Sequence, residues 1–147
     1  MVPGIVDSDT TAGHRVLKRV KKGRRAFQTQ RPGGQWLKGK SHETFGPLGP
    51  WMVTKDEIAD PNSLSMSLKV NGNVMQKGST KTFIFQVATV VSHISQYLTL
   101  EPGDVIPTGT PPGVGAGMNP QVFLNPGDVM ELEIEGLGSQ RQTVVSA

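Results

Sequence analysis

Cysteine is absent from the 147-residue sequence. Its absence excludes a disulfide framework and a thiolate zinc site and favours a reducing compartment, so we expect a cytoplasmic protein. Long apolar runs are also lacking: none approaches the roughly 20 residues that span a bilayer, and no apolar signal core follows the basic N-terminus. The sequence therefore predicts a single modest domain with no membrane partner and no export.

Positive charge is scarce outside the N-terminus. Residues 1–25 carry a net charge of +5, and residues 26–147 carry −2, which together give the formal charge of +3. The basic segment could contact phosphates, but it lacks the interleaved aromatic residues on which single-strand binders stack bases. A solvated basic segment is therefore the favoured interpretation, and nucleic acid is a disfavoured partner.

Two patterns predict regular structure. Residues 65–70 alternate polar and apolar side chains, and Asn71-Gly72 supplies the two positive φ angles of a type I′ turn before residues 74–76, so this region is predicted to form a β-hairpin. Residues 81–97 place apolar side chains three and four positions apart after a capping Ser79 or Thr80. We expect this helix to pack across a sheet and to contribute most of the core.

Several further strands are expected around turns that contain proline. Residues 51–54 form a short apolar run, and residues 100–106 and 124–130 each place a Pro-Gly turn before a strand. In the last of these strands Met130 begins an apolar set that alternates with glutamates, which we expect to face water. Several strands with one main helix predict an α+β domain with a mainly antiparallel sheet.

Two loops rich in glycine and proline concentrate polar side chains. In residues 39–51, Lys40 lies between glycine and serine on a loop that cannot extend a helix, so its ammonium could stabilise a carboxylate or enolate oxygen. In residues 108–117, Gly109 and Thr110 belong to a glycine-rich loop whose N–H groups could face an anion. A solvated Lys40, and a Thr110 hydroxyl that only satisfies its own loop, are the alternatives.

The sequence resembles the fumarylacetoacetate hydrolase family. Four blocks carry the resemblance in that family's order: Gly-Lys-Ser-x-x-Thr-Phe-x-Pro-Leu-Gly-Pro-Trp at 39–51, Val-Asn-Gly at 70–72, Pro-Gly-Asp-Val-Ile at 102–106 and Thr-Gly-Thr-Pro-Pro-Gly-Val-Gly at 108–115. The ending at 135–142 is similar to the branch that hydrolyses 2,4-dioxo sugar acids or resembles 2-hydroxyhepta-2,4-diene-1,7-dioate isomerase.

This resemblance implies a domain organisation and a set of site residues. Residues 26–147 are expected to form an incomplete catalytic domain, part of a β-roll, and residues 1–25 a basic segment that matches the family poorly. The resemblance assigns catalysis to Lys40. It assigns binding of substrate to Gln28, Lys40, Gly109 and Thr110.

The resemblance also implies a divalent cation, Mg²⁺ or Mn²⁺, that chelates the substrate's oxygens. The family's metal-binding aspartate aligns with Lys21 or with Arg19, neither of which can bind a cation, and its Glu-x-Glu pair is expected upstream of this chain. We therefore expect no metal ligands in this chain. Glu131, Glu133 and Glu135 mimic Glu-x-Glu, but on a strand face expected to be solvated.

The resemblance implies metal-dependent hydrolysis of a carbon–carbon bond in a dioxo or 2-oxo acid, such as an acylpyruvate or a 2,4-dioxo sugar acid, by a homodimer. One alternative is a catalytically inactive binding or dimerising scaffold, because the ligands are missing. Another is an isomerase or a decarboxylase on the same scaffold, because fold-level resemblance cannot separate these reactions.

Overall fold

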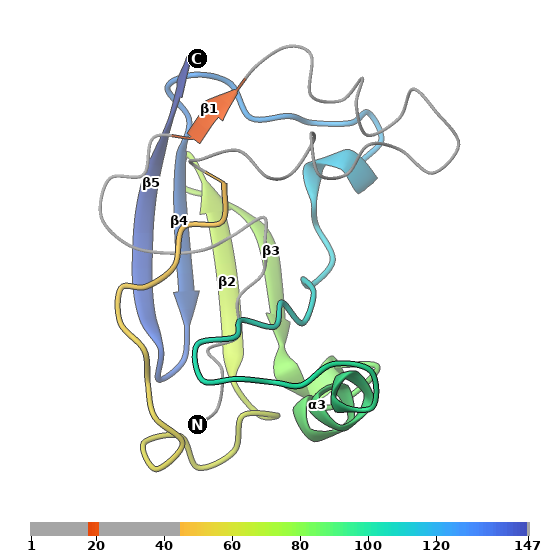
Figure 1. The fold of residues 1–147 in the computed structure, drawn as a ribbon. Helices are drawn as coiled ribbons and strands as arrows, with labels where there is room; N and C mark the ends of the chain where they lie inside the picture. Colours follow the sequence, from red (N-terminus) through yellow and green to blue (C-terminus); the bar gives the residue numbers. More distant parts are fainter. Residues whose placement is uncertain (1–17, 21–44, 147) are drawn as a thin grey trace.

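A computed structural model of the chain describes residues 18–20 and 45–146, with backbone alone for the first three. Within these residues five strands form one sheet in the order β1-β5-β4-β2-β3 (Figure 1). The strands are β1 (Lys18–Val20), β2 (Ser65–Val70), β3 (Asn73–Ser79), β4 (Val129–Ile134) and β5 (Gly138–Ser146). All pairs are antiparallel except β1 with β5. The expectation of a mainly antiparallel α+β fold is confirmed.

The predicted hairpin is present. Asn71 and Gly72 adopt φ angles of 51° and 78° between β2 and β3, as a type I′ turn requires. The Asn71 side chain also joins this turn to β4, because its Oδ1 accepts a hydrogen bond from the Val129 N–H at 2.8 Å. The hairpin is thereby tied to the strand that follows it in the sheet.

The helical region differs from the prediction. Residues Thr80–Thr82 form a 3₁₀ turn, and the only α-helix of the described residues, α3, spans Val87–Ser95. Thr80 is held against Leu64, whose N–H donates to the Thr80 hydroxyl at 2.9 Å and whose carbonyl accepts from the Thr80 N–H at 2.9 Å. The chain therefore leaves the sheet before the helix begins at Val87, whose N–H donates to Asn62 Oδ1 at 3.4 Å.

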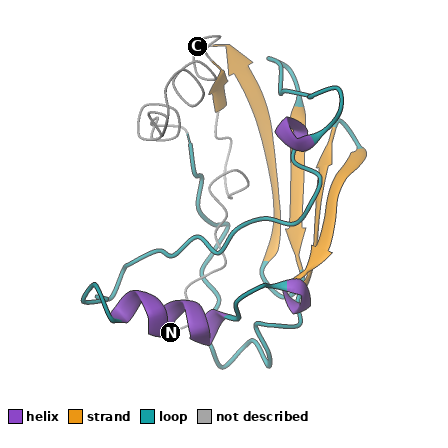
Figure 2. Cartoon of the chain, turned by 90° about the vertical axis from the view of Figure 1, so that its right-hand side faces the viewer, coloured by secondary structure: helices purple, strands orange, loops and turns teal. Residues whose placement is uncertain are grey.

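The expected role of the helix in the core was wrong. No residue of α3 is buried. Figures 1 and 2 show α3 projecting away from one end of the sheet instead of lying across a face. The core lies on the sheet itself and consists of Leu68, Met130 and Val144, with Val70, Leu124 and Leu132 packed around them.

Two of the other expected strands are absent from the described chain. Residues 51–54 and 104–106 have no strand pairing, and Val53 is the one buried residue of the first segment. The Pro-Gly turns themselves are present: Gly103 and Gly127 have φ angles of 106° and 96°. Only the second turn leads into a strand, β4, where Met130 is buried and Glu131 is exposed, as the alternation predicted.

Candidate functional site

The structure describes two of the predicted site residues. Gly109 and Thr110 lie in the loop that passes beside β3, and Gly109 has a φ angle of 100°, which favours glycine. Gln28 and Lys40 lie outside the described residues. The geometry of the site is therefore built from the Thr110 loop and from the segment that follows Lys40, residues 45–51.

Thr110 is held by a glutamine of the sheet. Thr110 Oγ1 accepts a hydrogen bond of 2.7 Å from Gln76 Nε2, and the Pro111 carbonyl accepts another, of 2.6 Å, from the same nitrogen. Gln76 is buried, whereas Thr110 is exposed. The partner of the Thr110 hydroxyl is thus 34 residues away in the sequence. The hydroxyl is bonded to the sheet, which differs from the alternative in which it forms a hydrogen bond only within its own loop.

Two close approaches fix the same loop on β3. A Cβ atom at Gly78 would lie 2.7 Å from Pro111 Cβ, and one at Gly113 would overlap the Met75 carbonyl oxygen. Glycine is required at both positions because the loop backbone lies directly on the strand. The loop is therefore a rigid part of the sheet edge.

The segment that follows Lys40 is held by similar contacts on β5, which lies at the other end of the four antiparallel strands from β3. Gln140 of β5 donates its side-chain amide to the Gly49 carbonyl. A Cβ atom at Gly138 would lie 2.8 Å from the ring of Trp51. A glutamine and a glycine of β5 thus contact the segment 45–51 in the way that Gln76 and Gly78 of β3 contact the Thr110 loop.

These contacts lie on two adjacent rows that cross the sheet. Paired residues on neighbouring strands share a face. The first row consists of Gln76, Leu68, Leu132 and Gln140, and the second of Gly78, Met66, Ile134 and Gly138. The Thr110 loop and the segment 45–51 are therefore attached to one face of the sheet, three strand spacings apart, or about 14 Å. The residues between the two glutamines are apolar.

Thr108 carries an unsatisfied polar atom beside this site. Its hydroxyl is buried and has no hydrogen-bond partner among residues 18–20 and 45–146. Buried hydroxyls normally have a partner, and an exception calls for a specific explanation, such as a catalytic role or a bound water or ion. The Thr108-Gly109-Thr110 run therefore presents one hydroxyl that is held by the sheet and one that is not.

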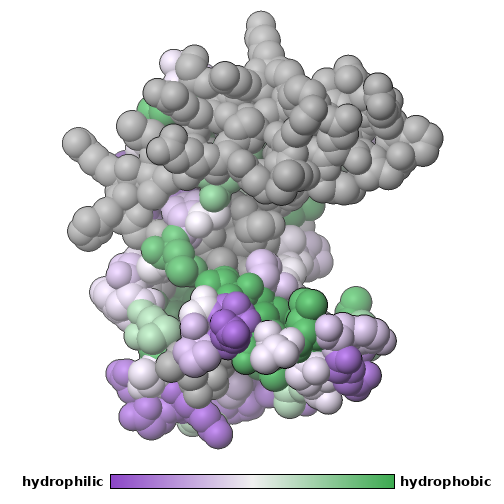
Figure 3. Space-filling model, in the orientation of Figure 1, coloured by the Kyte–Doolittle hydropathy of each residue, from purple (hydrophilic) through white to green (hydrophobic). Residues whose placement is uncertain are grey.

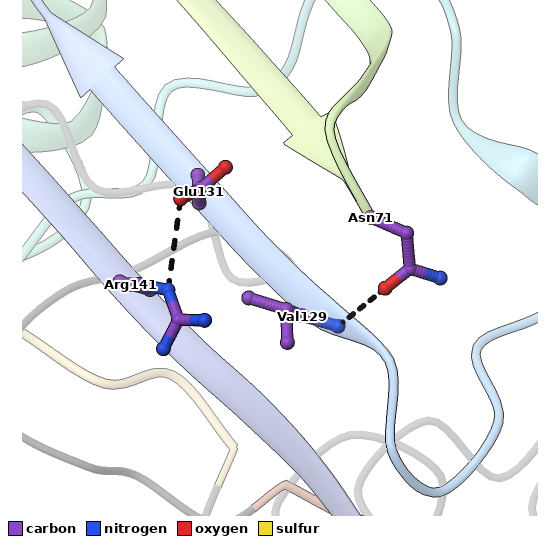
Figure 4. Close-up of polar contacts among 4 residues, drawn as sticks. All are labelled: Asn71, Val129, Glu131 and Arg141. Atoms are coloured by element: carbon purple, nitrogen blue, oxygen red, sulfur yellow. Dashed lines mark hydrogen bonds and ion pairs between the residues drawn. The ribbon is translucent and has the colours of Figure 1, made fainter.

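The acidic residues lie elsewhere. Glu131 is on the opposite face of the sheet, where its carboxylate is 3.6 Å from Arg141 Nε (Figure 4). Glu135 accepts hydrogen bonds from the Ser65 N–H and hydroxyl, which lower the pKa of its carboxyl. No group of three or more His, Asp or Glu side chains within the described ranges could hold a metal ion.

Sequence reasoning missed Gln76 and Gln140. The type I′ turn alone would pair Leu68 with Met75, but a β-bulge after Leu68 shifts the register, so that Leu68 faces Gln76. The bulge places the amide, and not the methionine, on the face that meets the loop. Gln140 lies four residues before Val144 on the same strand and so shares its inward face, and this alternation could have been noted as a signal for Gln140.

Similarity to known proteins identifies the family to which the chain belongs. The family model for the fumarylacetoacetate hydrolase C-terminal domain matches residues 8–145, and the chain belongs to this family. The match begins upstream of Ala26 and includes much of the basic segment, in which β1 pairs with β5. The division at residue 25 stays a prediction.

Members with different reactions resemble the chain. A 2,4-didehydro-3-deoxy-L-rhamnonate hydrolase of Sphingomonas sp. (strain SKA58) is 59% identical over 119 residues, which cover 80% of this chain and 42% of that protein. A 5-carboxymethyl-2-hydroxymuconate delta-isomerase from Mycobacterium smegmatis superposes with a TM-score of 0.70 at 34% identity, covering 90% of this chain and 55% of that one.

A third relative contains a metal. Maleylpyruvate hydrolase from Sphingobium sp. SYK-6, solved with manganese(II) and pyruvate, superposes with a TM-score of 0.68 at 28% identity and covers 90% of this chain and 50% of that one. The chain thus has the scaffold of a family of hydrolases and isomerases. It spans about half the length of these relatives.

Proposed function

We propose that this chain binds the substrate carboxylate in a catabolic hydrolase that cleaves a carbon–carbon bond in a dioxo or 2-oxo acid. The observation that carries the proposal is the hydrogen bond by which Gln76 holds the hydroxyl of Thr110, an exposed residue of the glycine-rich loop. The similarity to a hydrolase of a deoxy sugar acid supports this substrate class, with an acylpyruvate as the simplest member.

The proposed roles follow the chemistry of the residues. Thr110 donates its O–H to a substrate carboxylate, and the backbone at Gly109 lets the loop approach closely. Lys40 stabilises the negative charge on the enolate oxygen that forms when the carbon–carbon bond breaks, because a positioned ammonium is a strong electrostatic partner for such a charge. Gln28 donates its amide to a further substrate oxygen.

The divalent cation is a separate question. The described ranges contain no ligand set that fits Mg²⁺ or Mn²⁺, and the aspartate expected from the family has no counterpart at Arg19 or Lys21. The proposed roles therefore rest on protein groups alone. The manganese in the maleylpyruvate hydrolase structure is a property of that protein.

Calorimetric titration tests the proposal most directly. The full chain is titrated with Mn²⁺ or Mg²⁺ and with oxalate, which mimics a 2-oxo acid enolate, each alone and then together. Oxalate binding that Lys40→Met abolishes supports the proposed site, and metal-dependent turnover of an acylpyruvate supports hydrolysis. If Lys40→Met kept both oxalate binding and turnover, the proposed role of Lys40 would be contradicted.

A non-catalytic scaffold is the second candidate. It is motivated by the sequence, in which Arg19 or Lys21 stands where the family's metal-binding aspartate is expected. This candidate predicts binding of oxalate without any turnover, with or without Mn²⁺. Measurable turnover of an acylpyruvate by the chain alone would eliminate it.

An isomerase or a decarboxylase would use the same enolate. In an isomerase the enolate forms by loss of a C–H proton and is reprotonated at another carbon, and in a decarboxylase it forms when the substrate loses CO₂ and is then protonated, so the Thr110 and Lys40 roles would be unchanged. The similarity to a delta-isomerase motivates this alternative. Analysis of products by NMR separates the three reactions, because hydrolysis yields two organic fragments, decarboxylation yields one organic product and CO₂, and isomerisation yields one product of unchanged composition.

The partners proposed for the chain are a small dioxo or 2-oxo acid and a second copy of itself. Exposed apolar side chains flank α3, among them Ile84, Phe85, Tyr97 and Leu98, and Figure 3 shows apolar surface in this region. No described helix is long and apolar enough to cross a membrane. Nucleic acid remains a disfavoured partner, and absence of salt-dependent binding to DNA would confirm this.

A further inference from the structure

We propose that Gln76 is a positioning residue that makes the Thr110 hydroxyl a hydrogen-bond donor toward the ligand. This inference rests on the proposed function, because it assumes that Thr110 receives a carboxylate. Gln76 does not touch the ligand in this proposal. It acts by fixing which way the proton of Thr110 points.

The Pro111 carbonyl determines the orientation of the Gln76 amide. A carbonyl oxygen can only accept a hydrogen bond, so the atom 2.6 Å from it must be the amide nitrogen and not the amide oxygen. The same nitrogen lies 2.7 Å from Thr110 Oγ1. Both amide protons are therefore used, one for Pro111 and one for Thr110.

The orientation of the amide dictates the role of the hydroxyl. Because Thr110 Oγ1 accepts from Gln76, its own proton must point in another direction. Thr110 is exposed, and within the described residues its side chain forms no other hydrogen bond. The hydroxyl is thus presented outward as a donor, which matches an anionic oxygen and mismatches a group that can only donate, such as an ammonium.

Burial makes this arrangement rigid. Gln76 is 3% exposed, and the register shift that turns it inward is fixed by the pairing of Leu68 with Gln76 and of Lys69 with Val74. The loop cannot slide along the strand, since Gly78 and Gly113 are in contact with Pro111 and the Met75 carbonyl. A donor that is already oriented loses little entropy when the ligand binds.

Substitution of Gln76 by glutamate, a residue of nearly the same size, reverses the hydrogen bond to Thr110 and removes the one to the Pro111 carbonyl, because a carboxylate cannot donate. A carboxylate accepts from the Thr110 hydroxyl, so the proton turns inward and the outward donor is lost. The matched control is Gln121→Glu, because Gln121 also donates to a backbone carbonyl, that of Ala116 at 2.7 Å, but lies away from Thr110. Both substitutions make the same chemical change.

The experiment is a double-mutant cycle on the full chain, with oxalate as the probe and calorimetry as the readout, with and without Mn²⁺. We expect Gln76→Glu and Thr110→Val each to weaken oxalate binding about tenfold, as for one hydrogen bond to a charged group. Because Gln76 acts through Thr110, the double variant should bind no more weakly than Thr110→Val alone. Gln121→Glu should bind as the wild type does.

Two results would overturn the proposal while leaving the proposed function intact. The first is wild-type affinity in Gln76→Glu. The second is a further tenfold loss when Gln76→Glu is added to Thr110→Val, since a merely structural role would weaken binding in either background. Loss of oxalate binding in every chain, the wild type included, would instead contradict the proposed function.

A second measurement does not depend on ligand binding or on the folding of a variant. In the wild-type chain, proton exchange of the Gln76 side-chain amide is measured by NMR. Exchange much slower than that of the exposed Gln121 amide supports the fixed orientation. Exchange at the same rate as Gln121 would overturn it.

Discussion

Gly113 and Gly109 are both in the left-handed region, with φ angles of 112° and 100°, but their surroundings differ. A Cβ atom at Gly113 would overlap the Met75 carbonyl, whereas nothing lies within 4 Å of one at Gly109. We expect Gly113→Ala to destabilise the fold by more than about 3 kcal/mol, and Gly109→Ala by about 1–2 kcal/mol of backbone strain. Urea denaturation measures both. Equal losses would contradict the tight approach of the loop to β3.

Asp128 makes stability depend on acid. The Asn125 N–H, at 2.6 Å, and the Asn71 side chain, at 2.8 Å, lower the pKa of its carboxyl below the ordinary value. The unfolded chain, with a pKa of about 3.9, then binds more protons than the folded one. The stabilisation is present above that pH and is lost as the pH falls through the folded pKa.

Asp128→Asn should therefore flatten the fall in unfolding free energy below about pH 4. The measurement is urea denaturation at a series of pH values from neutral to acid. Glu133→Gln is the control for the change in net charge, because Glu133 is an exposed residue of the same region. An unchanged acid slope in Asp128→Asn would contradict the assignment.

At the scale of elements, α3 contributes less to stability than the core of the sheet. Val90 of α3 is half-buried, whereas Val144 of β5 is 1% exposed. We expect Val144→Ala to cost about 2–3 kcal/mol of unfolding free energy and Val90→Ala about 1 kcal/mol or less. Thermal or urea unfolding distinguishes them. A larger loss of unfolding free energy in Val90→Ala than in Val144→Ala would instead support the predicted role of the helix as the main contributor to the core.

The elements that could be predicted from the sequence are those with local causes. Asn71-Gly72 sets the hairpin through its own backbone preferences, and alternation along β4 reports which face is buried. The start of α3 could not be predicted, because it depends on Asn62 and on the attachment of Thr80 to Leu64, which are long-range contacts. Apolar spacing at 81–86 therefore misled the prediction.

The candidate site divides in the same way. That a glycine-rich loop carries Thr110 could be predicted from its own residues, since the positive φ angle of Gly109 is a local preference of glycine. The binding role of Thr110 stays a prediction. The role of Gln76 could not be predicted, because a bulge decides whether Gln76 or Met75 faces the loop, and a bulge shifts the register by one residue without a clear sequence signal. Gln28 and Lys40 lie outside the described residues, so their predicted roles stay predictions.

At the scale of the whole molecule, the two most exposed large apolar side chains of the described residues, Ile84 and Tyr97, flank α3. Ile84 is 91% exposed and Phe85 65% before the helix, and Tyr97 is 73% exposed after it. Isolated exposed apolar residues are ordinary, but a contiguous patch on a small domain marks a surface that contacts another molecule. We take that molecule to be a second copy of the chain, in line with the proposed homodimer.

This proposal predicts self-association that depends on the α3 surface. The double variant Ile84→Asp, Phe85→Asp should shift the chain toward the monomer by at least tenfold in dissociation constant, because two charges would be buried in an apolar contact. Sedimentation velocity over a range of concentrations measures the shift. Val74→Asp is the matched control, since Val74 is 57% exposed but lies on β3, outside the helix. A wild-type chain that stays monomeric at every concentration would contradict the homodimer. An equal increase of the dissociation constant in Val74→Asp would show that the contact is not specific to the α3 surface.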